Sequence, residues 1–215
     1  MDDRHFDKQS AVDWIEVIES SPVSKRDHDL YPKLNSWIAN TRVRDILDLG
    51  CGQGSISSKL NLEDIKFRGV DPSRHLISRA KELYPHLSDS FAIGNIYNLP
   101  FGDEEFDGVF SIAVWHLLSD LSLASRELAR VLKPEGNFFI FTANNEYLEV
   151  WTASYDLVEK KEVKVIGKDS QNNIKDIIYL YSKDETQSSL EMEGLKIESV
   201  ESIRIWNLFI GKRKS

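Results

Sequence analysis

The sequence predicts an α/β fold built on one seven-stranded, mostly parallel sheet, with an antiparallel last strand and helices on both faces. Apolar runs of strand length alternate along the chain with segments whose apolar residues recur at helical spacing. The run at 106–112 is mostly apolar, as in a parallel strand covered on both faces. The last two runs, 195–205 and 206–212, follow each other directly and indicate a final hairpin.

The composition is that of an ordinary globular domain, with 215 residues, of which 41% are hydrophobic and 29% are charged. A net charge of −8 disfavours nonspecific binding to duplex nucleic acid. The single cysteine, Cys51, excludes internal disulfides and fits a reducing compartment, so we expect a cytoplasmic protein. The charged N-terminus lacks a signal-peptide core, and no apolar run reaches transmembrane length.

Two helices are predicted before the first strand. Residues 8–19 and 30–38 each carry apolar residues at helical spacing, and a polar link at 24–29 separates them. We therefore expect residues 1–40 to form an N-terminal helical cap that packs on the sheet.

The first strand, about 44–49, leads into a glycine-rich turn at 50–54 and a short helix at about 55–61. Glycine lets the backbone bend and leaves room for a ligand, and a helix N-terminus offers free N–H groups. Because the third residue after Gly52 is Ser55, the turn lacks the dinucleotide fingerprint, and no Gly-Lys-Ser/Thr P-loop occurs. The alternative is a tight turn that binds nothing.

The second strand, 66–71, ends at Asp71, and Pro72 biases that residue towards an extended conformation. An acidic residue at this position can accept hydrogen bonds from both ribose hydroxyls of a nucleoside. The alternative role is the N-cap of the next helix, 73–84, for which Ser73 is the better candidate.

The order of these motifs resembles the class I S-adenosylmethionine-dependent methyltransferases. The resemblance rests on Asp-x-Gly-x-Gly-x-Gly at 48–54, on Gly-Val-Asp-Pro-Ser at 69–73 and on the stretch 98–109, and it covers about residues 40–142. It implies a Rossmann-like methyltransferase domain over 1–215 that binds S-adenosyl-L-methionine and releases S-adenosyl-L-homocysteine. The cofactor-binding residues that it implies are Asp48, Gly50, Cys51, Gly52, Gly54, Asp71, Pro72, Asn95, Ile96 and Ser111.

The third strand, 91–94, brings Asn95 and Ile96 to the same edge of the sheet. The resembled family commonly has an acidic residue where Asn95 stands, near the adenine amino group. The amide oxygen of Asn95 can still accept a hydrogen bond from such a group.

The rest of the chain supplies the remaining strands of the sheet and a further region outside it. A helix at 117–132, a turn at 133–136 and a fifth strand at 137–142 follow the fourth strand. Two further strands, 162–167 and 174–182, and a helix at 183–193 precede the final hairpin. By resemblance, we expect residues 144–182 to be a variable region over the pocket.

The expected reaction is methyl transfer to an unidentified acceptor, which we expect to be a small molecule. Transfer requires the reacting atoms to be aligned and water to be excluded, and an oxygen nucleophile usually needs a general base. His116 follows the fourth strand and is the candidate for that base, or else lines the pocket. Tyr31 and Trp115 are candidate substrate contacts, and no metal ligands are assigned. Two alternatives are a non-catalytic cofactor- or nucleoside-binding protein on the same fold and, less favoured, a nicotinamide-dependent oxidoreductase.

Overall fold

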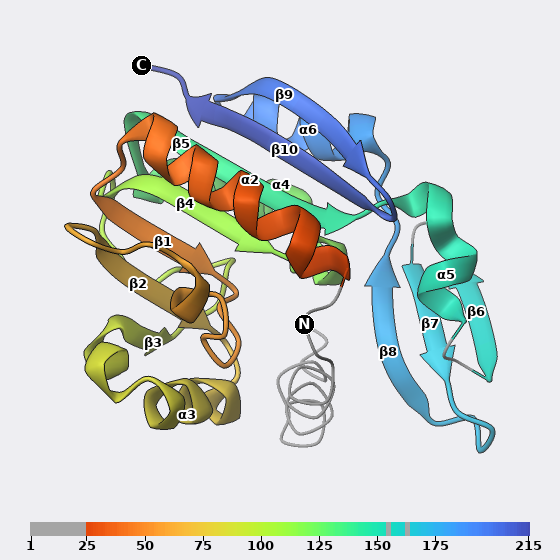
Figure 1. The fold of residues 1–215 in the computed structure, drawn as a ribbon. Helices are drawn as coiled ribbons and strands as arrows, with labels where there is room; N and C mark the ends of the chain where they lie inside the picture. The colour runs from red at the N-terminus through yellow and green to blue at the C-terminus, as the bar shows by residue number, and fades with distance from the viewer. Residues whose placement is uncertain (1–24, 154–155, 162–163) are drawn as a thin grey trace.

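The computed structural model describes residues 25–153, 156–161 and 164–215. Seven strands form one sheet in the order β3-β2-β1-β4-β5-β10-β9 (Figure 1). The strands are β1 Asp45–Leu49, β2 Lys66–Asp71, β3 Phe91–Ile93, β4 Phe106–Ile112, β5 Leu132–Ala143, β9 Leu195–Ile203 and β10 Trp206–Arg213.

The strand directions confirm the predicted fold class. All neighbouring pairs from β3 to β5 are parallel, whereas β10 runs antiparallel to both β5 and β9. β5 begins earlier than expected: Leu132 pairs with Phe106, and the predicted turn at 133–136 is an irregularity in the register before Asn137 pairs with Gly108.

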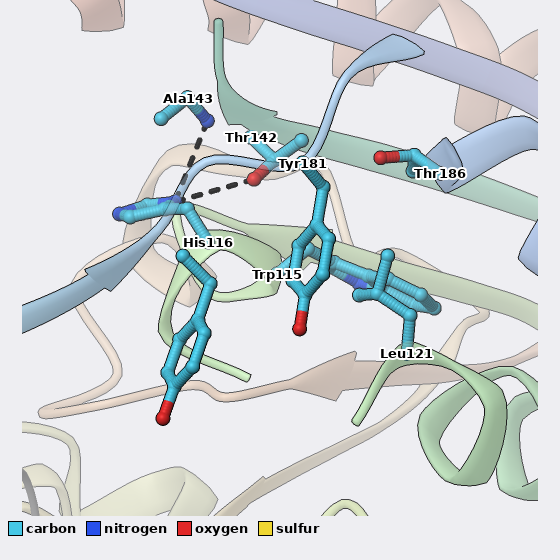
Figure 2. Close-up of a pocket in the computed structure, with 8 residues that line it drawn as sticks. Trp115, His116, Leu121, Thr142, Ala143, Tyr181 and Thr186 are labelled. Carbon is cyan, nitrogen blue, oxygen red and sulfur yellow. Dashed lines mark hydrogen bonds between the residues drawn. The ribbon is translucent and has the colours of Figure 1, made fainter. Parts of the chain in front are cut away.

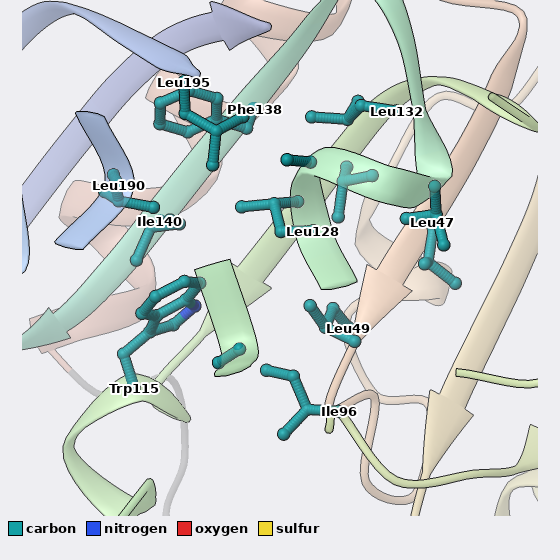
Figure 3. Packing of buried hydrophobic residues seen from close by; sticks show 14 of the residues in the cluster. Leu47, Leu49, Ile96, Trp115, Leu128, Leu132, Phe138, Ile140, Leu190 and Leu195 are labelled. Carbon is teal, nitrogen blue, oxygen red and sulfur yellow. The ribbon is translucent and has the colours of Figure 1, made fainter. Parts of the chain in front are cut away.

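Helices cover both faces of the sheet, as alternation along the strands requires. On β5, Phe138 and Ile140 belong to a core cluster with the helices α4, Leu121–Val131, and α6, Lys183–Met192. The intervening Phe139 and Phe141 belong to a second cluster, with α2, Lys25–Thr41, and α3, Arg74–Leu83. Figure 3 shows the first of these clusters, in which Leu47, Leu49, Leu128, Leu190 and Leu195 also meet.

The helix boundaries differ from the sequence prediction at two places. α2 begins at Lys25, so the expected polar link forms its first turns, while the predicted helix at 8–19 lies outside the described residues. α4 begins at Leu121, because the Asp120 carboxylate accepts the Leu123 N–H at 3.0 Å and caps the helix there.

The predicted helix at 55–61 is wrong. Only a short 3-10 turn, η2 Ser57–Lys59, is present. The Ser57 hydroxyl donates to the Gly54 carbonyl at 2.7 Å, and the Ser58 hydroxyl donates to the Ser55 carbonyl at 3.0 Å. Serine side chains thus take the backbone acceptors that a regular helix would use.

A second, three-stranded sheet stands beside the main one, in the order β6-β7-β8. Its strands are β6 Leu157–Lys161, β7 Lys164–Lys168 and β8 Ile174–Tyr179, and the short helix α5, Leu148–Thr152, precedes it. Two of its strands were predicted; β6 was not, because three charged residues follow its two apolar ones. This sheet lies beyond the carboxyl end of β5 (Figure 1). Among the described helices, none is long and apolar enough to cross a membrane.

Candidate functional site

The glycine-rich turn is fastened to the neighbouring strand. β1 and β2 pair in parallel up to Leu49 and Val70. The N–H groups of Gly50 and Cys51 both donate to the Val70 carbonyl, at 2.8 and 3.0 Å. The turn therefore folds back over the carboxyl end of β2, where the predicted ribose ligand Asp71 stands.

Asp71 is 8% exposed, and its carboxylate holds the turn in place. One oxygen accepts the Gly52 N–H at 3.0 Å, and the other accepts the Ser73 N–H at 2.9 Å. Burial raises the pKa of Asp71 to about 6, although both N–H bonds act in the opposite direction. Ser73 caps α3 by accepting the Leu76 N–H, so the N-cap role falls to Ser73. A carboxylate oxygen can accept more than one hydrogen bond, so Asp71 keeps acceptor capacity for a diol.

Asp48 is buried at 0% exposure, and neither of its oxygens has a hydrogen-bond partner among the described residues. Burial, and secondly the negative charge of Asp71, raise the pKa of Asp48 well above its usual range. Nearby in the turn, the buried Gln53 amide oxygen also lacks a partner in the described structure. Unpaired buried acceptors are costly, so this part of the site fits a ligand that brings hydrogen-bond donors or a positive charge.

The glycines of the turn serve packing as well as any ligand. All three have positive φ, +83° at Gly50, +54° at Gly52 and +76° at Gly54. A Cβ added at Gly50 would lie 2.3 Å from a Val114 methyl group, and one at Gly54 would lie 2.7 Å from the Phe91 ring. The sequence interpretation explained these glycines by room for a ligand, whereas at Gly50 and Gly54 the space is needed by other parts of the protein.

Tyr97, which the sequence analysis did not single out, holds the loop after β3 in place. The Asn95 amide oxygen accepts the Tyr97 N–H at 2.9 Å, and Ile96 beside it is buried. The Tyr97 hydroxyl in turn accepts the N–H groups of Ser119 and Asp120, at 2.8 and 3.2 Å. The loop that carries Asn95 is thereby joined to the start of α4.

Three further predicted cofactor residues have structural surroundings that limit their roles. Ser111 is buried, and its hydroxyl donates to the Leu49 carbonyl at 2.8 Å, which ties β4 to β1. The Cys51 thiol is buried, and burial is the main cause that raises its pKa, so it is not a thiolate nucleophile. Pro72 is half-buried directly after Asp71. Tyr31 is half-buried on α2.

His116 lies at the carboxyl ends of β4 and β5, where Figure 2 shows its contacts. Its Nδ1 accepts the Ala143 N–H at a long 3.4 Å and lies 3.2 Å from the Thr142 hydroxyl oxygen. β4 ends at Ile112, opposite Phe141, so no strand residue of β4 reaches the Ala143 N–H. Because a main-chain N–H only donates, Nδ1 presents its lone pair, and the proton of a neutral His116 sits on Nε2.

Aromatic rings from separate segments meet around His116. The ring of His116 lies 5.8 Å from that of Trp151 in α5 and 6.1 Å from that of Trp206 at the start of β10. Trp206 also stacks on Phe141 at 5.0 Å. The sequence interpretation named none of these three as site residues, because their meeting depends on how β5, α5 and β10 are placed. Trp115, the other predicted substrate contact, is buried in the core cluster that contains α4 and α6.

Comparison with known proteins identifies the family of the segment that carries most of this site. Residues 47–140 match the family described as a methyltransferase domain. This segment is a methyltransferase domain. The prediction of a class I methyltransferase is thus confirmed for the part of the chain that runs from β1 to β5.

The methyltransferase domain has relatives of known name. The chain is 32% identical over 123 residues to a malonyl-[acyl-carrier protein] O-methyltransferase of Erwinia billingiae, which covers 57% of this chain and 48% of that one. It is 28% identical over 163 residues to the 27-O-demethylrifamycin SV methyltransferase of Amycolatopsis mediterranei, covering 74% and 56%. The chain thus spans about half the length of these curated relatives.

Solved structures share the fold of the methyltransferase domain and its surroundings. A Pyrococcus horikoshii protein superposes with a TM-score of 0.73 at 24% identity, covering 90% of this chain and 94% of that one. An S-adenosylmethionine-dependent methyltransferase of Clostridium acetobutylicum gives 0.72 at 15% identity, covering 96% and 98%. The [4+2]-cyclase SpnF shares the fold with a TM-score of 0.63 at 16% identity, covering 85% and 81%.

The methyltransferase domain contains all of the predicted cofactor residues and both Trp115 and His116. Tyr31 and the aromatic residues Trp151 and Trp206 lie outside the matched segment. The segment that matches the family therefore carries the predicted cofactor residues, whereas two of the rings beside His116 come from outside it.

Proposed function

We propose that the protein is an S-adenosylmethionine-dependent methyltransferase that methylates an oxygen atom of a small-molecule acceptor. The observation that carries the proposal is the pair of buried carboxylates at the glycine turn of a methyltransferase domain. Asp48 is buried without a partner among the described residues, and Asp71 keeps acceptor capacity at the end of β2.

The residues present fit the cofactor. Asp71 would accept hydrogen bonds from the ribose hydroxyls, because its carboxylate has lone pairs besides the one that accepts the Gly52 N–H. Asp48, with the Gln53 amide oxygen, would receive the ammonium group of the amino-acid part. Asn95 and Ile96 would lie along the adenine, with Gly50, Cys51, Gly52, Gly54, Pro72 and Ser111 forming the main-chain and packing surface around the ligand.

S-adenosylmethionine supplies a methyl group that its sulfonium charge already activates. The protein's part is to align the acceptor oxygen and to exclude water. The Nδ1 lone pair of His116 is already taken by the Ala143 N–H, which favours pocket lining over a general-base role for His116. An acceptor oxygen that is acidic enough to ionise near neutral pH would not require a base.

Oxygen as the methyl acceptor is supported by the names of the relatives. An O-methyltransferase acting on malonyl-[acyl-carrier protein], a 27-O-demethylrifamycin SV methyltransferase and a fatty-acid O-methyltransferase are among them. The proposed binding site for the methyl acceptor includes Tyr31 and Trp115. It also includes the variable region at 144–182 and the part of the N-terminal cap at 25–40. Nucleic acid is disfavoured by the net charge of −8, and a cytoplasmic location stays a prediction from the single cysteine.

The competing function is a protein that binds the cofactor but does not transfer its methyl group. The cyclase among the structural neighbours is an instance of a different reaction on this fold, so the fold does not decide the chemistry. Intact Asp48 and Asp71 agree with binding under both functions.

Titration calorimetry with S-adenosylhomocysteine and with NAD tests the cofactor assignment. We expect binding of the first and none of the second, with Asp71→Ala weakening the affinity about ten- to hundredfold through a lost charge-assisted hydrogen bond. Binding of NAD alone would refute the proposal. Transfer of labelled methyl from S-adenosylmethionine to pooled small hydroxy compounds then separates an enzyme from a binding protein.

A further inference from the structure

The phenol of Tyr97 joins the loop after β3 to the segment that precedes α4. Its hydroxyl oxygen accepts the N–H groups of Ser119 and Asp120, at 2.8 and 3.2 Å, and lies 3.3 Å from the Ser119 hydroxyl oxygen. The Asp120 carboxylate is itself occupied in capping α4, where it accepts the Leu123 N–H. Both main-chain groups precede the first residue of α4, so the phenol supplies an acceptor that the helix does not.

The main chain of the same tyrosine orients the side chain of Asn95. The Tyr97 N–H donates to the Asn95 amide oxygen at 2.9 Å, and the Asn98 N–H donates to the Asn95 carbonyl at 3.0 Å. Residues 95–98 thus form a tight turn, and the phenol of its third residue anchors that turn. Because a main-chain N–H only donates, the Asn95 amide has its oxygen, and not its nitrogen, towards Tyr97.

The far end of this loop is anchored within α4, by a separate set of contacts. The Glu127 carboxylate accepts the Leu99 N–H at 2.8 Å. The Arg130 guanidinium donates to the carbonyls of Leu99 and Phe101, at 3.3 and 2.8 Å. The hydrogen bond from Arg130 is also the main cause that lowers the pKa of Glu127. The loop therefore has two anchors, and the one formed by the phenol is adjacent to Asn95.

We propose that Tyr97 is a positioning residue for the cofactor, which holds the Asn95 amide oxygen where it accepts a hydrogen bond from the adenine amino group. The inference rests on the proposed function and adds a residue to it. A carboxylate offers two equivalent oxygens, whereas an amide offers one oxygen and one NH₂ group. An Asn95 amide that turned over would present donors to the amino group, which itself donates. The orientation of this single oxygen is therefore what Tyr97 secures.

The substitution Tyr97→Phe removes the hydroxyl and keeps the ring, which is half-buried against the core cluster that contains α4 and α6. In calorimetry of the full chain, we expect it to weaken S-adenosylhomocysteine about two- to tenfold, the range of one neutral hydrogen bond. Tyr84→Phe is the matched control. It also removes a phenol hydroxyl, which donates to the Ser58 hydroxyl at 3.5 Å, and should bind as the parent does. Unchanged affinity in Tyr97→Phe, or an equal loss in Tyr84→Phe, would overturn the proposal.

The Asn95→Asp background separates positioning from a general loss of stability. An aspartate at this position presents an oxygen in either orientation, so the further substitution Tyr97→Phe should weaken S-adenosylhomocysteine by less than about twofold. Thermal unfolding should show the same loss of stability from Tyr97→Phe in both backgrounds. An equal loss of affinity in the two backgrounds would mean that Tyr97 supports only the fold, and would contradict the proposal.

Failure of this inference differs from failure of the proposed function. If S-adenosylhomocysteine does not bind the parent protein, the proposed function fails. If it binds, and Tyr97→Phe binds it equally well, only the role of Tyr97 fails.

Hydrogen exchange in the parent protein covers the case in which a variant does not fold. Opening that breaks the Tyr97 bonds should also release the adenine, so S-adenosylhomocysteine at about ten times its Kd should slow exchange of the Ser119 and Asp120 amides up to about tenfold. 5′-Methylthioadenosine should do the same, and homocysteine should not. The Gly194 amide, which donates to the Glu191 carbonyl at 3.1 Å, is the comparison. Unchanged exchange at Ser119 and Asp120, or equal slowing at Gly194, would overturn the proposal.

Discussion

Two buried carboxylates give the site its chemical character at the scale of single residues. Asp71 shares its charge with two main-chain N–H groups, whereas Asp48 has no partner among the described residues. Both have pKa values raised mainly by burial. Burial therefore disfavours the charged form of both carboxylates, to different degrees. A ligand that donates hydrogen bonds would stabilise the charged form of each.

The raised pKa of Asp71 makes stability depend on pH in a definite direction. The pKa of Asp71 is about 6 in the folded state, whereas the unfolded carboxyl loses its proton near its ordinary pKa of 3.8. Stability from this group is therefore present below pH 4 and is lost as pH rises towards 6, by about 3 kcal/mol. Urea unfolding of the ligand-free protein between pH 4 and 6 measures the effect, and Asp71→Asn should remove that part of the slope. A flat parent profile would contradict it.

Asp48 is predicted to recognise the charged end of the cofactor and not its nucleoside. Asp48→Asn should weaken S-adenosylhomocysteine by about ten- to hundredfold, because a bond to a charged group is lost. The same substitution should leave 5′-methylthioadenosine almost unaffected, since that nucleoside has no ammonium group. Calorimetry of both ligands makes the comparison, and an equal loss for the two would place the ammonium elsewhere.

At the scale of elements, the glycine turn joins two strand ends and has two separable functions. Gly50 and Gly54 leave space for Val114 and for Phe91, so they are required by packing. Gly52 donates its N–H to Asp71 and has φ of +54°, and in the proposed site it forms part of the ligand-binding surface of the turn.

Substitutions at these glycines should therefore differ in what they damage. Gly52→Val is expected to abolish binding of S-adenosylhomocysteine and to lower stability by about 1–3 kcal/mol through backbone strain. Gly50→Ala should mainly destabilise the fold, because its Cβ would lie 2.3 Å from Val114, and Val114→Ala should restore part of the loss. Calorimetry and thermal unfolding separate the two effects. Retained binding in folded Gly52→Val would show that this glycine serves the turn alone.

At the scale of the whole molecule, the two sheets have separate cores. The main sheet is packed on both faces, whereas Val165, Ile178 and Leu180 form a small cluster of their own beside α5. The smaller sheet thus has far less buried apolar surface to hold it, and we expect it to open more easily than the strands at the centre of the main sheet.

A matched pair of substitutions tests this division. Val165→Ala in β7 and Val109→Ala in β4 each remove two methyl groups from a fully or almost fully buried valine. We expect Val165→Ala to speed amide hydrogen exchange in β6 to β8 and to spare β4 and β5, with S-adenosylhomocysteine bound as before. Val109→Ala should cost about 1–3 kcal/mol of global stability. Uniform loss of protection in Val165→Ala would mean that the sheets unfold as one.

The sequence by itself determined the seven strands of the main sheet and their order along the chain, and it predicted the residues proposed to bind the cofactor. Apolar periodicity depends on local spacing, and Asp48, the glycines and Asp71 lie at the ends of strands that the sequence already delimits. The helix predicted at 55–61 was wrong for a local reason. The hydroxyls of Ser57 and Ser58 donate to backbone carbonyls that a regular helix would use.

Only the tertiary structure decided what surrounds His116 and which glycines serve packing. The residues that meet there are Phe141, Trp151 and Trp206, and Trp206 lies far along the chain from the other two, so their approach depends on how β10 pairs with β5. The Nδ1 lone pair of His116 accepts the Ala143 N–H, which no strand residue of β4 reaches because β5 extends beyond the end of β4. Such contacts depend on the distances between elements. The spacing of residues within one element does not predict those distances.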